Sequence, residues 1–254
     1  MVDTINRFNN RVEDYAKFRP TYPRPIMDLL EADCGLAKTS LVADVGSGTG
    51  ILAEMFLRNG NTVFGVEPNA EMRSSAESLL SNYHQFKSVD GAAEATTLDS
   101  RSIDIITAAQ AFHWFDRSRA RAEFGRILKP QGWVALIWNE RRLDSTPFLR
   151  AFEELLMQYG TDYQKIRHEN VTGEIADFFA PQGFRRESFE NIQTFDFESL
   201  LGRVRSASYT PEPDNQSFAP MVASLREIFD EHQQCGTIAF EYDTRIYYGQ
   251  LTIT

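Results

Sequence analysis

The chain has very few residues that could form a disulfide framework or a metal centre. Its 254 residues include 2 cysteines, Cys34 and Cys235, and 4 histidines. The two thiols lack the spacing of a metal-binding motif, and the histidines are scattered along the sequence. We therefore expect no metal site. Such sparse cysteine also favours a protein of the reducing cytoplasm.

Long hydrophobic runs and an excess of positive charge are missing as well. No stretch reaches the roughly 18 apolar residues of a membrane-spanning helix, and the N-terminus lacks the apolar core of an export signal. The 36 aspartate and glutamate residues outnumber the 26 lysine and arginine residues, which gives a net charge of −10. Such a charge disfavours a nucleic acid or an anionic membrane as the main partner. The partner we expect is a small molecule.

Glycine, in contrast, is concentrated in one segment that follows an apolar run. Residues 41–50 (LVADVGSGTG) place glycine at positions 46, 48 and 50, and helix-forming residues follow from Ile51. This pattern predicts a strand, a tight turn and a helix. Glycine permits positive φ angles and lets a ligand approach the backbone, while the start of the helix offers free N–H groups to an anionic ligand group. The turn is therefore a candidate small-molecule site.

The next predicted strand bears on which ligand the turn binds. Residues 62–67 end in Glu67, 17 residues after Gly50, close to where an acid binds the hydroxyls of a ribose. A dinucleotide fingerprint also needs glycine or alanine at the sixth position counted from Gly46, where this chain has Ile51. An NAD-dependent oxidoreductase is therefore the weaker hypothesis.

The segments Ala43–Gly50 and Gly65–Pro68 resemble the class I S-adenosylmethionine-dependent methyltransferases, over about the first 140 residues. Two flanking segments, Tyr15–Pro23 and Ala109–Phe115, are similar to those of small-molecule methyltransferases of the trans-aconitate methyltransferase type. The resemblance implies S-adenosylmethionine as the cofactor and a small-molecule methyl acceptor, with a carboxylate or a hydroxyl as the acceptor group. A non-catalytic module that binds the same cofactor is the alternative.

The resemblance also implies which residues contact the cofactor. Tyr15 and Arg19 correspond to residues at its methionine end, where a guanidinium suits the carboxylate. Glu67 corresponds to the acid that binds the ribose. The remaining residues implied by the resemblance are Asp44, Gly46, Ser47, Gly48, Gly50, Pro68, Met72, Ala92, Ala93 and Gln110.

The adenine contact departs from the pattern of the family. Members often carry an acid directly after the glycine that follows the third strand, whereas this chain has Ala92 there. We therefore expect backbone groups of Ala92 and Ala93 to hold the adenine. Asp90 and Glu94 are the alternative side-chain partners.

Catalysis by such an enzyme rests on positioning and desolvation, because the methyl group is already activated by the positive sulfur. His113 is the candidate catalytic residue, a general base whose unperturbed pKa lies near the operating pH. Alternatively, His113 packs beside Trp114 and only shapes the pocket. A carboxylate acceptor needs no base, and Arg203 or Arg205 would then bind a second carboxylate.

The fold we expect is α/β, a Rossmann-like seven-stranded class I methyltransferase sheet whose last strand is antiparallel, with helices on both faces and a helical cap. Strands are predicted at 41–45, 62–67, 86–89, 102–109, 133–138, 188–197 and 238–248. Helices are predicted at 26–36, 51–57, 70–80, 117–128, 148–159, 173–179, 198–208 and 217–235.

We expect one methyltransferase domain over residues 1–254. Its parts are an N-terminal gate segment (1–21), a cofactor-binding core (22–140), cap helices with the sixth strand (141–235) and the final strand (236–254). The arginines of the helix at 117–128 are predicted to form mostly a solvated face; they are Arg117, Arg119, Arg121 and Arg126.

Overall fold

The protein is built around one seven-stranded sheet in the order β3-β2-β1-β4-β5-β7-β6. The structure is a computed structural model that describes residues 17–161, 163 and 171–251. The strands are β1 (Leu41–Val45), β2 (Thr62–Val66), β3 (Phe86–Val89), β4 (Ile103–Ala109), β5 (Leu128–Arg141), β6 (Arg185–Phe195) and β7 (Ile238–Gly249). Strands β1 to β5 are parallel, whereas β7 is antiparallel to both β5 and β6. The predicted class I methyltransferase sheet is confirmed.

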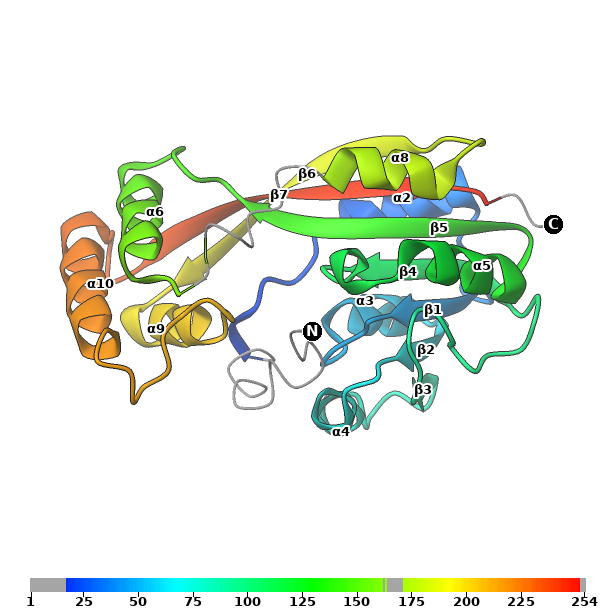
Figure 1. The fold of residues 1–254 in the computed structure, drawn as a ribbon, viewed down its shortest axis with the longest axis horizontal. Coiled ribbons are helices and arrows are strands. Elements are labelled where there is room, and N and C mark those ends of the chain that lie inside the picture. Colours follow the sequence, from blue (N-terminus) through cyan, green and yellow to red (C-terminus); the bar gives the residue numbers. More distant parts are fainter. Residues whose placement is uncertain (1–16, 162, 164–170, 252–254) are drawn as a thin grey trace.

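Helices cover both faces of the parallel part of the sheet (Figure 1). Leu30 and Phe56 pack with Val42 on one face, and Phe124 and Phe178 belong to the cluster on the other face. Because β1 is buried on both sides, its sequence is an apolar run rather than an alternation. The helices are α2 (Pro25–Cys34), α3 (Ile51–Asn59), α4 (Ala70–Leu79), the 3-10 helix η2 (Phe112–Trp114), α5 (Arg117–Ile127), α6 (Pro147–Tyr159), α8 (Val171–Phe179), α9 (Phe197–Arg205) and α10 (Phe218–His232).

The strands β5, β6 and β7 extend beyond the parallel part of the sheet into a second region, the cap (Figure 1). There α6, α9 and α10 cover them with a separate apolar cluster that includes Phe152 and Phe240. Met221, Leu225 and Phe229 of α10 are buried in this cluster. Their spacing of four residues places them on one face of the helix, which is the face that packs on the core.

Strand β5 is longer at both ends than the predicted strand at 133–138. The turn residues at 129–132 were predicted to end the preceding helix, but α5 stops at Ile127 because Leu128 already pairs with Ile103 of β4. At the other end the strand continues to Arg141, which pairs with Tyr242 of β7. Pairing with neighbouring strands, which the local sequence does not encode, sets both ends.

The four arginines of α5 are exposed or partly exposed, as predicted, but three of them also make contacts that their own helix does not reveal. Arg117 forms an ion pair with Glu174 of α8, with its Nη2 2.6 Å from the Oε2 atom. Arg121 donates to the carbonyl oxygens of Phe178 and Ala180, at 2.8 and 2.7 Å. These contacts join α5 to α8. Arg126 binds a loop described below.

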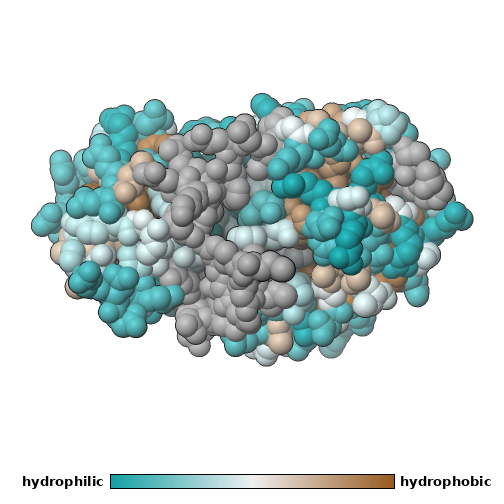
Figure 2. Space-filling view, viewed as in Figure 1, coloured by the Kyte–Doolittle hydropathy of each residue, from teal (hydrophilic) through white to brown (hydrophobic). Residues whose placement is uncertain are grey.

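Most of the described surface facing the viewer in Figure 2 is hydrophilic. The exposed large apolar side chains come from separate elements rather than one patch; they are Leu79, Trp114, Met157 and Ile192. Of the helices that the structure describes, none is long and apolar enough to cross a lipid bilayer.

Candidate cofactor-binding site

A pocket of about 270 Å³ opens where β1, β2 and β4 end. Ligands of open α/β sheets bind at this carboxyl edge. Of the residues predicted for the cofactor, those that line the pocket are Gly46, Gly48, Glu67, Pro68, Met72, Ala92, Ala93 and Gln110. Asp44, which precedes the turn, and the turn residues Ser47 and Gly50 are not part of the lining. Tyr15 lies outside the described residues.

The three glycines of the turn have different roles, although all three have positive φ angles of 71°, 55° and 85°. A β-carbon on Gly46 would lie 2.6 Å from the β-carbon of Ala111, and one on Gly50 would lie 2.6 Å from Leu80. Beside Gly48, nothing lies within 4 Å of that position. The first and third glycines therefore allow close packing, whereas Gly48 leaves open space in the pocket, which fits a ligand that lies against the backbone.

The carboxylate of Glu67 is fixed at the rim of this space by two backbone groups. Its Oε2 atom accepts from the N–H of Gly48 at 3.0 Å, and its Oε1 atom accepts from the N–H of Asn69 at 2.9 Å. Burial raises the pKa of Glu67, against the effect of these two hydrogen bonds. Each oxygen retains a lone pair. The carboxylate can therefore accept two further hydroxyl groups, which fits the diol of a ribose.

Asp44 supports the turn from the interior. Its side chain is 1% exposed, and its Oδ1 atom accepts from the hydroxyl of Thr107 at 2.9 Å. Burial raises the pKa of Asp44 to about 7, and the nearby charge of Glu67 acts in the same direction. Asp44 thus adds a second carboxyl close to Glu67 without lining the pocket.

The wall predicted for adenine is a tight turn after β3. The N–H of Ala92 donates to the carbonyl of Ala95 at 3.2 Å, and the reverse bond is 3.0 Å long. The N–H of Ala92 is therefore used within the turn, and the backbone of Ala93 becomes the stronger candidate for adenine. Of the alternative acids, Glu94 accepts from the N–H of Asp116 at 2.6 Å, and Asp90 forms an ion pair with Arg73 at 3.0 Å.

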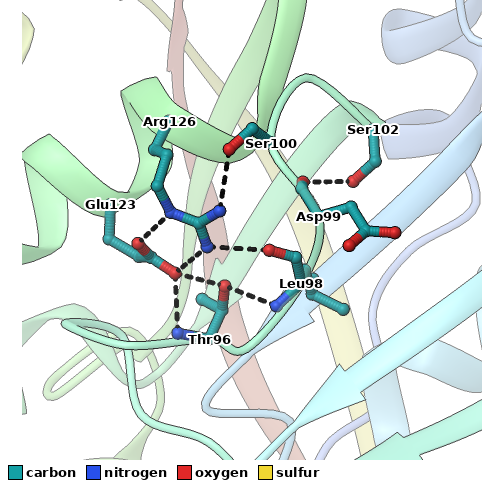
Figure 3. A network of polar contacts seen from close by, with 7 residues as sticks. All are labelled: Thr96, Leu98, Asp99, Ser100, Ser102, Glu123 and Arg126. Carbon is teal, nitrogen blue, oxygen red and sulfur yellow. Dashed lines mark hydrogen bonds and ion pairs between the residues drawn. The ribbon is translucent and has the colours of Figure 1, made fainter.

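A polar network holds the loop that follows this turn (Figure 3). Glu123 of α5 accepts from the N–H and the hydroxyl of Thr96, at 2.8 and 2.5 Å. Arg126 donates to Glu123, to the carbonyl of Leu98 and to the hydroxyl of Ser100. The hydrogen bonds from Arg126 and Thr96 hold the pKa of Glu123 at about 2. The network fixes the backbone that carries Ala92 and Ala93.

The opposite wall is the segment after β4. Gln110 has a positive φ of 53°, and its Nε2 atom donates to the carbonyl of Asn139 at 3.0 Å. The ring centroids of His113 and Trp114 lie 4.6 Å apart. His113 therefore packs beside Trp114, as expected in the alternative to a role as general base. His113 is not part of the pocket lining. A catalytic role for His113 stays a prediction.

Arg19 lies near the cap rather than in the pocket lining. Its Nη2 atom donates to the carbonyl of Ser206, just after α9, at 2.8 Å. A contact from Arg19 to the cofactor stays a prediction.

Several pocket residues were not predicted as site residues. They are Asn69, Ala109, Ala111, Trp114 and Phe115. They end β4 or lie in the segments after β2 and β4, so their position at the carboxyl edge was the available signal. The side chain of Asn69 also caps α4, since it accepts from the N–H of Met72 at 3.0 Å. Glu94, which lines the pocket too, is one of the two alternative acids predicted for adenine.

A sheet of this order, with a glycine turn after β1 and a half-buried acid after β2, is the fold of the class I S-adenosylmethionine-dependent methyltransferases. Residues 43–136 match the family described as a methyltransferase domain. An uncharacterised methyltransferase of Mycobacterium tuberculosis is 37% identical over 228 residues, which cover 89% of this chain and 86% of the relative. One from Schizosaccharomyces pombe is 30% identical over 231 residues, covering 88% and 86%. The chain therefore belongs to the methyltransferase family.

Solved structures share the fold at low sequence identity. A protein from Anaeromyxobacter dehalogenans, provisionally described as a type II methyltransferase, gives a TM-score of 0.65 at 20% identity, covering 92% of this chain and 98% of its own. A phosphoethanolamine N-methyltransferase from Haemonchus contortus, solved with phosphomonomethylethanolamine and S-adenosylhomocysteine, gives 0.57 at 15% identity, covering 98% of this chain and 59% of its own.

Proposed function

We propose that the protein transfers a methyl group from S-adenosylmethionine to an oxygen atom of a small molecule, in a carboxylate or a hydroxyl group. One observation carries most of this proposal. The half-buried carboxylate of Glu67 is oriented by the N–H groups of Gly48 and Asn69 at the rim of an open pocket. A dinucleotide would need a small residue at the position of Ile51, so the pocket favours the methyl donor.

In this proposal each wall of the pocket binds one part of the cofactor. Glu67 accepts the ribose hydroxyls, while Met72 and Ala93 contact the adenine. The turn from Gly46 to Gly50, supported by Asp44, faces the methionine end. Arg19, together with Tyr15, would bind the methionine carboxylate when the N-terminal segment lies over the pocket.

Methyl transfer requires the protein to position and desolvate the cofactor and the acceptor rather than to supply a nucleophile. The cofactor supplies a methyl carbon that its positive sulfur has already activated. Trp114 and Phe115 give the pocket an apolar wall that excludes water from the reacting atoms. A hydroxyl acceptor would lose its proton to His113, whereas a carboxylate needs no base.

We also propose that the protein is a single domain whose parts have separate roles. Residues 22–140 hold the cofactor, the cap helices α6, α9 and α10 within 141–235 cover the acceptor, 236–254 complete the sheet, and 1–21 act as a gate. Helix α8, which belongs to the same range, packs on the core instead. Both cysteines of the chain, Cys34 and Cys235, are free thiols, which fits a reducing cytoplasm.

The experiment is a turnover assay with labelled S-adenosylmethionine and a panel of small carboxylic acids and alcohols. Production of S-adenosylhomocysteine that depends on one acceptor and is lost in Glu67→Ala supports the proposal. Binding of S-adenosylhomocysteine without any turnover would favour a non-catalytic module. Calorimetric binding of NADH in place of S-adenosylhomocysteine would favour an oxidoreductase.

A further inference from the structure

The face of the sheet next to the pocket carries a row of polar side chains. Arg141, the last residue of β5, lies opposite Tyr242 of β7, which lies opposite Asn191 of β6. Directly opposed residues project to the same face, as do residues two positions apart along a strand. Asn139 and Gln193 therefore share the face of Arg141.

This face begins beside the cofactor pocket. Gln110, which lines the pocket, donates to the carbonyl of Asn139, and Arg141 follows two residues later, about 7 Å along the strand. The N-terminal segment crosses the same face, since the carbonyl of Thr21 accepts from Asn139 and Asn191 at 3.2 and 2.7 Å. A molecule bound at Arg141 would thus lie between the cap, the N-terminal segment and the cofactor.

Arg141 is held in place but is only partly used. Its side chain is 9% exposed, and its Nη2 atom donates to Glu153 of α6 and to the hydroxyl of Tyr163, the latter at 3.0 Å. Tyr163 in turn donates to Glu153 at 2.5 Å. The other terminal nitrogen, Nη1, is buried and has no hydrogen-bond partner among the described residues.

Gln193 leaves a second polar atom unused on the same face. Its Nε2 atom donates to the carbonyl of Phe18 at 3.2 Å, but its buried Oε1 atom has no partner in the described part of the chain. Buried donors and acceptors are normally paired, because an unpaired one loses its hydration without compensation. A ligand bound on this face would pair with both the free donor and the free acceptor.

The charge of this region determines what kind of ligand fits. Arg203 is 8% exposed and donates to the hydroxyl of Tyr242 at 3.3 Å, so a second guanidinium lies beside the residue opposite Arg141. The second terminal nitrogen of Arg141 is not used by Glu153. A guanidinium fork binds carboxylate and phosphate oxygens, and the low dielectric of a buried site strengthens that contact.

We propose that Arg141 binds an anionic group of the methyl acceptor and that Gln193 accepts a hydrogen bond from a hydroxyl or amine of the same molecule. The acceptor is then a small organic anion, either a carboxylate or a phosphate monoester, whose anionic group lies away from the methylated oxygen. This assignment rests on the proposed methyltransferase function and adds the substrate class.

The test compares charged and neutral acceptors on the full chain loaded with S-adenosylmethionine. The panel contains di- and tricarboxylates of four to six carbons, hydroxyalkyl phosphates, and the neutral methyl esters or unphosphorylated alcohols that match them. We expect turnover only of anions, and the two halves of the panel separate a carboxylate from a phosphate. Turnover confined to neutral molecules would overturn the proposal. So would a protein that methylates no anion when loaded with S-adenosylmethionine and binds no anion when loaded with S-adenosylhomocysteine.

Variants locate the effect at Arg141. For the best anion, Arg141→Lys should raise KM at least tenfold with a smaller change in kcat, while the dissociation constant of S-adenosylhomocysteine stays within twofold. Arg141→Met removes the cation that balances the charge of Glu153, so Arg141→Met/Glu153→Gln is the variant that keeps the interior neutral. Arg150→Met, at an exposed arginine of α6, is the matched control. An unchanged KM in folded Arg141 variants would overturn the proposal. A wild-type protein that does not bind S-adenosylhomocysteine would instead refute the proposed function.

Discussion

Replacing Glu67 tests whether the rim of the pocket binds the ribose of S-adenosylmethionine. The carboxylate is already oriented by the N–H groups of Gly48 and Asn69, so it needs no rearrangement to accept two hydroxyl groups. Glu67→Ala removes both acceptors and the negative charge. It also releases the two N–H groups, which water or the ligand can then reach in an open pocket.

The expected magnitude follows from the number and kind of bonds lost. A hydrogen bond to a charged group is worth about 1.5–3 kcal/mol, and the two share the desolvation of one carboxylate. We expect a loss of about 2–3 kcal/mol, which is about 30- to 150-fold in the dissociation constant. Glu67→Gln is not conservative here, because its NH₂ group must face the N–H of either Gly48 or Asn69, and it should lose part of the same affinity.

Isothermal titration calorimetry with S-adenosylhomocysteine measures this change, and circular dichroism verifies that each variant is folded. Glu71→Gln is the matched control, because Glu71 is exposed in the first turn of α4 and should bind like the wild type. A folded Glu67→Ala protein with the wild-type dissociation constant would refute the ribose assignment.

Three further predictions concern the turn, the loop network and the N-terminal segment. Gly48→Val should abolish S-adenosylhomocysteine binding in calorimetry, because its side chain fills the open space at a φ of 55°; wild-type affinity would mean that the ligand binds elsewhere. Glu123→Gln should lower the free energy of unfolding by about 1–2 kcal/mol at neutral pH, allowing for solvent screening. Because the native pKa of about 2 lies below the ordinary value, the wild-type advantage should be complete above about pH 4.5 and vanish as the pH falls through 2; melts that keep the same gap at pH 2 would contradict this. Amide hydrogen exchange at residues 18–21 should slow when S-adenosylhomocysteine is added, and unchanged exchange would rule out a gate.

The local sequence was sufficient for much of the cofactor half. The alternation of apolar strands and amphipathic helices depends on neighbours along the chain, and so do the glycine turn and the acid at Glu67. Glycine at 46 and 50 was expected from φ angles, and the structure adds that Ala111 and Leu80 leave no room for a β-carbon.

Contacts between distant segments were beyond such an analysis. Arg126 was assigned to a solvated face because its helix gave no sign of the loop at 96–102 that it binds. Arg141 lay outside the predicted fifth strand, since only pairing with β7 extends that strand to it. Its ion pair with Glu153 and the unused Nη1 atom depend on how α6 packs on the sheet.

A crystal structure of the protein with S-adenosylhomocysteine is the most direct test of the account. The account predicts the ribose hydroxyls within hydrogen-bond distance of both carboxylate oxygens of Glu67, the adenine against Met72 and Ala93, and the ligand backbone alongside Gly48. Density for the ligand outside this pocket, or a ribose that does not contact Glu67, would contradict it.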